Sequence, residues 1–95
     1  MTDSVSILGV VYKIEYVEVV NKEDPRFGQT DFFNSVIKID SSLSDDMKKQ
    51  TLIHEIMHCI CWALGLYDIG ENENAIQSIA SALYDISKNN QTIFS

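Results

Sequence analysis

One long predicted helix, between Ser44 and Gly65, constrains this chain more than any other feature. Ser44 suits an N-cap, and Asp45 and Asp46 bring negative charge to the first turn, where the helix dipole favours it. Gly65 suits the position just after the last helical residue. Apolar residues recur between them at helical spacing, and these residues are Ile53, Ile56, Met57, Ile60 and Leu64. We therefore expect a capped helix that buries one face.

The segments before this helix favour β-structure. Residues 5–20 are rich in Val, Ile and Tyr and predict one strand, in which Gly9 marks a bulge or a close backbone approach. Residues 27–33 have turn chemistry between aromatic residues and predict an irregular segment. Residues 34–40 predict a second strand.

A second helix is predicted over about residues 73–87, after a polar loop at 68–74, and residues 88–95 are expected to form a frayed tail. This order predicts one α+β domain over residues 1–95. We expect a short antiparallel sheet packed with the long helix and a second, C-terminal helix.

Charge and composition exclude several classes of protein. The net charge of −7 disfavours binding to nucleic acid, because an acidic surface repels phosphates. No apolar run is long enough to cross a bilayer, and the first residues lack the basic region of a secretory signal. Cys59 and Cys61 lie two positions apart on a predicted helix and cannot pair with each other, which favours a reducing cytosol. The sequence does not indicate an oligomeric state.

The long helix contains an H-E-x-x-H motif, His54-Glu55-Ile56-Met57-His58. Residues four apart on a helix lie on one face, so the two imidazoles can reach the same Zn²⁺ ion. Glu55 is adjacent to the first ligand and can serve as a general base toward a water that the metal activates. These are the only two histidines of the chain. The competing interpretation is a solvated helix face that carries two histidines and an ordinary surface carboxylate.

A catalytic zinc site usually has three protein ligands, so one more is needed. Glu73 is the first candidate, because it shares the inward stripe of the second helix; charge compensation at a helix N-terminus is the competing interpretation. Glu71, in the preceding loop, is the alternative, and Asp68 is a third choice. Cys61 could add a soft ligand, but a small buried apolar role is favoured. The ligand types also accept Mn²⁺, Fe²⁺ or Ni²⁺.

The surrounding residues carry a resemblance to a known family. Thr51–His58, preceded by Ile37–Asp40, resembles the phage and mobile-element metallopeptidases of the ImmA/IrrE type. Glu73–Leu83, an acidic helix start followed by small and apolar residues, is similar as well. Phe27–Asp31 is similar to the segment that precedes the strand in small phage proteins of this kind. The resemblance covers roughly residues 27–87, and only the H-E-x-x-H core is highly specific.

The resemblance implies a small zincin-like domain of gluzincin type in a bacterial cytoplasm. His54 and His58 would bind zinc, Glu55 would be the base, and a Glu of the following helix would complete the site. Family members are intracellular, and some cleave repressor proteins. The run from Glu71 to Ala75 differs from the Glu-x-Glu-Ala-Asn-like run of larger members, which leaves the third ligand open.

The leading hypothesis is therefore a zinc metallopeptidase that acts on a peptide or protein substrate, such as a repressor. A substrate strand could pair with an exposed edge strand, for which residues 34–40 are the candidate. Trp62 is expected to pack against neighbouring elements rather than to line a substrate pocket. The alternatives are a catalytically inactive zinc-binding phage structural protein, and an antirepressor-type interaction module that needs no metal.

Overall fold

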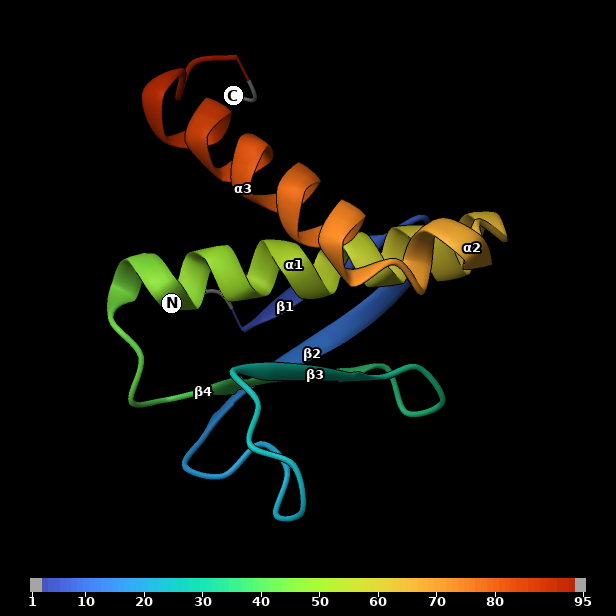
Figure 1. Ribbon diagram of the computed structural model, residues 1–95, viewed down its shortest axis with the longest axis vertical. Helices are drawn as coiled ribbons and strands as arrows, with labels where there is room; N and C mark the ends of the chain where they lie inside the picture. Colours follow the sequence, from blue (N-terminus) through green and yellow to red (C-terminus); the bar gives the residue numbers. More distant parts are fainter. Residues whose placement is uncertain (1–2, 94–95) are drawn as a thin grey trace.

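A computed structural model describes residues 3–93 of the chain, and it confirms the α+β class (Figure 1). Within these residues, four strands form one sheet, and three helices follow them along the chain. The elements are β1 (Ser4–Ile7), β2 (Val10–Val17), β3 (Gly28–Asp31), β4 (Val36–Asp40), α1 (Asp45–Leu64), α2 (Tyr67–Gly70) and α3 (Glu73–Asn89).

The sheet is mixed, so the predicted antiparallel sheet is wrong for its central pair. The strand order is β1-β2-β4-β3; β1 pairs antiparallel with β2 and β3 antiparallel with β4, whereas β2 and β4 run parallel. The physical reason lies in the composition of the β3–β4 hairpin. The apolar strand β4 takes the central position beside β2, and the polar strand β3 is left at the edge. Residues 34–40 therefore do not supply an edge strand.

The segment predicted as one strand over residues 5–20 is instead two strands, because the chain reverses at Leu8 and Gly9, and the second strand ends at Val17. Both residues have positive φ, 48° and 88°, and they separate β1 from β2 in a two-residue hairpin. Positive φ at both central positions is the geometry that matches the twist of paired strands. Glycine adopts this geometry without strain, but leucine rarely does. The turn therefore lacks the residue types that usually mark a turn in a sequence.

Three other segments refine the predictions. Part of the segment expected to be irregular, residues 27–33, is the edge strand β3, and the short helix α2 overlaps the start of the polar loop predicted at 68–74. The second helix is confirmed and continues to Asn89, into the predicted frayed tail. The last part of that tail, residues 94–95, lies outside the described residues.

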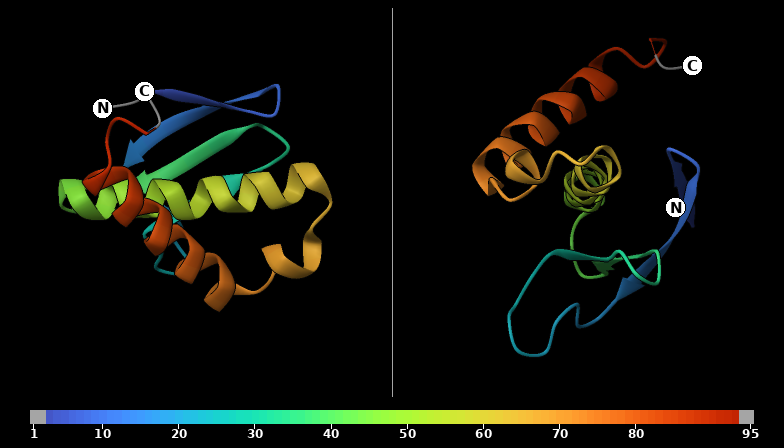
Figure 2. Two further views of the ribbon diagram at one scale, coloured as in Figure 1. Left: turned by 90° about the horizontal axis from the view of Figure 1, so that it is seen from above. Right: turned by 90° about the vertical axis from the view of Figure 1, so that its right-hand side faces the viewer.

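The helix α1 forms as predicted. The Ser44 side chain accepts a hydrogen bond from the Met47 backbone N–H, and Gly65 ends the helix with a positive φ of 70°. The helix is the middle layer of three, between the sheet on one side and α3 on the other (Figure 2).

Because α1 is packed on two sides, its buried surface is wider than the predicted stripe. Toward the sheet, Cys59 is fully buried with the core residues of β2 and β4; burial raises the pKa of its thiol to about 11 and keeps it neutral. Toward α3, Met57 and Cys61 pack against Ile76 and Ala80. Leu64, predicted to face the core, is 56% exposed.

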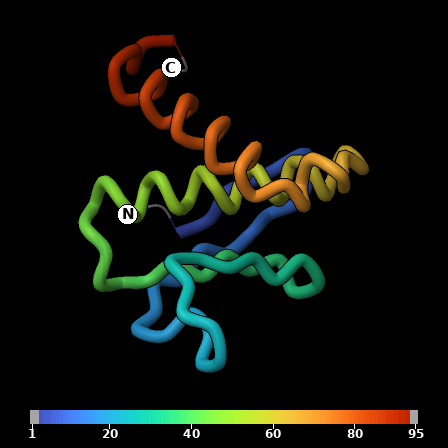
Figure 3. The backbone as a smooth tube through the Cα atoms, in the orientation of Figure 1, coloured from blue at the N-terminus to red at the C-terminus, as the bar shows by residue number. Residues whose placement is uncertain are grey.

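After Gly65 the chain reverses through α2, and α3 then runs back over α1 (Figure 3). This reversal brings the first turn of α3 over the middle of α1, so residues far apart in the sequence meet there. Within residues 3–93, no helix combines the length and the apolar character needed to cross a membrane.

Candidate metal centre

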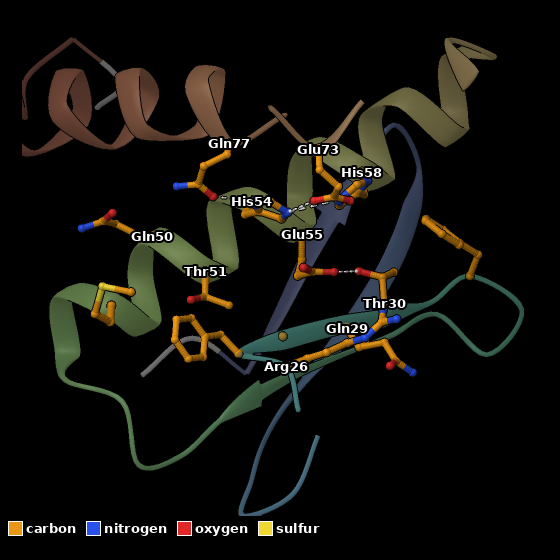
Figure 4. A pocket seen from close by; sticks show the side chains of 14 residues that line it. Arg26, Gln29, Thr30, Gln50, Thr51, His54, Glu55, His58, Glu73 and Gln77 are labelled. Atoms are coloured by element: carbon orange, nitrogen blue, oxygen red, sulfur yellow. Dashed lines mark hydrogen bonds and ion pairs between the residues drawn. The ribbon is translucent and has the colours of Figure 1, made fainter. Parts of the chain in front are cut away.

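His54 and His58 project from α1 toward Glu73, the first residue of α3. The two Nε2 atoms are 3.3 Å apart. One Glu73 oxygen lies 3.0 Å from His54 Nε2, and the other lies 3.1 Å from His58 Nε2. Two imidazole nitrogens and one carboxylate thus converge on a single point, as Figure 4 shows.

The loop between the helices fixes the position of Glu73. Gly65 caps α1, and the Leu66 N–H donates to the Cys61 carbonyl, which turns the chain sharply. At the other end of the loop, the Asn72 side chain accepts from the Ala75 N–H and starts α3. Glu73 is therefore held one residue inside a capped helix rather than on a free loop.

Gln77, one turn after Glu73, orients the first histidine. Its Oε1 lies 2.8 Å from His54 Nδ1, and its Nε2 donates to Ser81 Oγ at 3.1 Å. Because the amide nitrogen is used by Ser81, the amide oxygen faces the imidazole and accepts from Nδ1–H. This tautomer leaves a lone pair on His54 Nε2, which is the form that a metal ligand requires.

The three side chains fit a zinc ion in number, type and spacing. Among the described residues, His54, His58 and Glu73 are the group of ligand-type side chains whose donor atoms all lie within 4.8 Å of one another. A tetrahedral ion with bonds of about 2.0–2.2 Å separates its ligands by roughly 3.3–3.6 Å. The observed separations of 3.0 to 3.3 Å are close to that value. Two imidazoles and one carboxylate are also a ligand set that zinc sites in proteins use.

Glu55, next to His54 on α1, lines the same cavity as the two histidines, and its carboxylate reaches toward the sheet. Its Oε1 accepts a hydrogen bond from Thr30 Oγ1, on β3, at 2.9 Å, and the residue is only 7% exposed. Burial raises the pKa of Glu55, and the Thr30 hydrogen bond and the two neighbouring histidines oppose that rise. A buried carboxylate held in place by one donor suits a group that takes up and releases a proton.

The close approach of β3 to α1 depends on Gly28. A Cβ atom at this position would lie 2.7 Å from Thr51 Cγ2 and 3.3 Å from Glu55 Cγ. Glycine therefore lets the edge strand lie directly against the helix, which brings Thr30 within reach of Glu55.

A cavity of about 710 Å³ opens between β3, α1 and the start of α3. The two histidines, Glu55 and Glu73 line it, and Arg26 is its positively charged wall residue. The histidine side chains are 18% and 17% exposed and that of Glu73 is 66% exposed, so the two imidazoles are partly shielded and the carboxylate lies open to solvent.

The other predicted ligands lie outside this group. Glu71 lines a second cavity beside Trp62, and Cys61 is 3% exposed in the core between α1 and α3. Asp68 lies on α2 and lines neither of the two cavities described. The structure thus brings Glu73, and not its alternatives, next to the two histidines.

Sequence reasoning missed Thr30 and Gln77. The Gln77 position carried a signal, because it lies four residues after Glu73 and so on the same face of the helix. Thr30 carried none, since 25 residues separate it from Glu55 and its segment was expected to be irregular.

No protein-family model, curated protein or solved structure matched this chain. The resemblance to the ImmA/IrrE-type metallopeptidases therefore stays a prediction.

Proposed function

We propose that this protein is a zinc-dependent peptidase. The observation that carries the proposal is the convergence of His54, His58 and Glu73 beside a buried Glu55 in one open cavity. The two free thiols of Cys59 and Cys61 suit work in a reducing compartment, such as a bacterial cytoplasm.

His54, His58 and Glu73 would hold the ion, with Gln77 fixing the tautomer of His54. A zinc ion bound there would supply Lewis-acid chemistry, polarising the substrate carbonyl and making a water molecule more acidic. Glu55 would act as general base toward that water and then pass the proton to the leaving amine. Thr30 orients the Glu55 carboxylate through its hydrogen bond.

The edge strand β3 is the wall of the cavity opposite the histidines, and Gly28, Gln29 and Thr30 line it. Its free edge could pair with the main chain of an extended peptide. We therefore propose a peptide or an unfolded protein segment, such as part of a repressor, as substrate. Residues 34–40 were the predicted strand for this pairing. They include β4, which is internal to the sheet, so we propose β3 in its place.

Elemental analysis of protein purified without chelator tests the metal. We expect about one zinc ion per chain in the wild type, as three protein ligands imply. Glu73→Ala should lose most of it, and Glu71→Ala is the matched control that should keep it. A wild type without zinc, whose stability does not respond to added zinc, would refute the metal centre.

Glu55→Gln tests the catalysis separately. The variant should bind zinc as the wild type does, because the three ligands remain. It should no longer cleave a mixed peptide library, as measured by mass spectrometry of the products. Cleavage at the wild-type rate would remove Glu55 from the mechanism. A zinc-loaded wild type that cleaves nothing would instead indicate a structural zinc site, in which the ion only stabilises the fold.

A further inference from the structure

A second cavity, of about 450 Å³, lies beside the metal centre toward the C-terminal end of α1. His58 and Phe32 line both cavities, so the two spaces share a wall. Apart from His58 and one carboxylate, the lining of the second cavity is aromatic or apolar.

Three aromatic rings, one from a turn and two from helices, form part of this lining. Phe32, in the turn after β3, stacks on Trp62 of α1 with ring centroids 4.8 Å apart. Tyr67, at the start of α2, meets Trp62 at 5.8 Å with a tilt of 60°. Trp62 is nevertheless 47% exposed and Tyr67 56% exposed, so their packing against each other leaves ring surface open. Trp62 was expected only to pack; in the structure it also lines this cavity.

The inner wall is closed and apolar. Gly70 of α2 lies against α1 so closely that a Cβ atom there would be 3.1 Å from the Cβ of Cys61. Cys61 itself is 3% exposed. The only carboxylate of the lining belongs to Glu71. Such a space favours an apolar guest, since an acidic group would lose its hydration and meet a like charge.

We propose that the second cavity binds an apolar, preferably aromatic, side chain of a peptide whose main chain lies across the metal centre. This proposal rests on the proposed peptidase function and adds to it a preference for large apolar residues next to the cleaved bond. Because His58 and Phe32 line both cavities, a side chain in the second cavity lies next to the bond at the metal centre. The aromatic lining determines that this side chain is apolar.

Fluorescence of Trp62 tests this directly, because it is the only tryptophan of the chain. The probes are three acetylated, amidated tripeptides, Ala-Phe-Ala, Ala-Ala-Ala and Ala-Asp-Ala, added to the wild-type protein with and without zinc. We expect a saturable spectral shift with the phenylalanine peptide, and an affinity at least about tenfold higher than for the other two. Equal affinities for all three would overturn the proposal.

Two variants locate the binding. Tyr67→Ala removes one wall at a half-exposed position and should weaken binding of the phenylalanine peptide by about tenfold. Phe33→Ala is the matched control: Phe33 is the neighbour of Phe32, is 93% exposed and lines neither cavity. An equal loss in both variants would place the binding elsewhere on the surface.

Hydrolysis by the zinc-loaded protein separates this proposal from the one it rests on. Cleavage with kcat/KM values within about twofold for the phenylalanine and alanine peptides would overturn the side-chain cavity and leave the peptidase. Selective binding without any cleavage would keep the cavity as a peptide site and overturn the peptidase.

Discussion

Replacing Gly28 with alanine tests whether the edge strand β3 must touch α1. The added methyl group would lie 2.7 Å from Thr51 Cγ2, well inside the 3.4 Å at which ordinary van der Waals contact begins. It would also lie 3.3 Å from both Glu55 Cγ and Ile39 Cδ1, so a small shift away from Thr51 cannot relieve the clash. Thr51 is 8% exposed and β-branched, and its side chain cannot simply rotate away.

The strand must therefore move off the helix, and we expect a cost of about 1–3 kcal/mol in the free energy of unfolding. A cost near the middle of that range lowers the melting temperature of a domain of this size by roughly 8–16 °C. Urea denaturation should show a lower midpoint with an unchanged slope, because the unfolded surface does not change.

A double-mutant cycle with Thr51→Ser identifies the clashing atom. Serine lacks Cγ2 but keeps the hydroxyl, and alone it should cost about 1 kcal/mol for the lost methyl group. The double variant should then be more stable than the sum of the single costs predicts, by at least about 1 kcal/mol. Additive costs, or a neutral Gly28→Ala, would refute the close approach.

Three further predictions concern the core, the helix cap and the metal centre. Ile37→Ala should lower the free energy of unfolding by about 2–5 kcal/mol, measured by urea denaturation, because Ile37 is fully buried. Val11→Ala, at a 63% exposed position, should change it by no more than about 0.5 kcal/mol. Similar costs for the two variants would contradict the placement of the core. Ser44→Ala should lower the free energy of unfolding by about 1 kcal/mol through loss of the α1 cap, and an unchanged melting temperature would argue against that cap. Gln77→Leu should weaken zinc binding by about 10- to 100-fold in competition with a chelator while the metal-free protein keeps its stability; undiminished affinity would remove Gln77 from the centre.

The sequence by itself determined the features that depend on neighbours along the chain. Helix caps act within one turn, so Ser44 and Gly65 could be placed as the ends of α1. The i, i+4 spacing of a helix is also local, which is why His54 and His58 could be expected on one face. The same periodicity put Glu73 on the inward stripe of its helix and made it the first candidate for a third ligand.

The tertiary structure decided whatever depends on which segments meet. Pairing β4 rather than β3 with β2 follows from competition among strands for the buried position, and a segment does not reveal that outcome alone. The sequence left Glu71 open as an alternative; the path of the chain through α2 placed Glu73, and not Glu71, beside the two histidines. The contact of Thr30 with Glu55 required β3 to lie against α1, across 25 positions of sequence. Periodicity and capping act over a few residues, whereas burial is shared among segments that only the complete fold brings together.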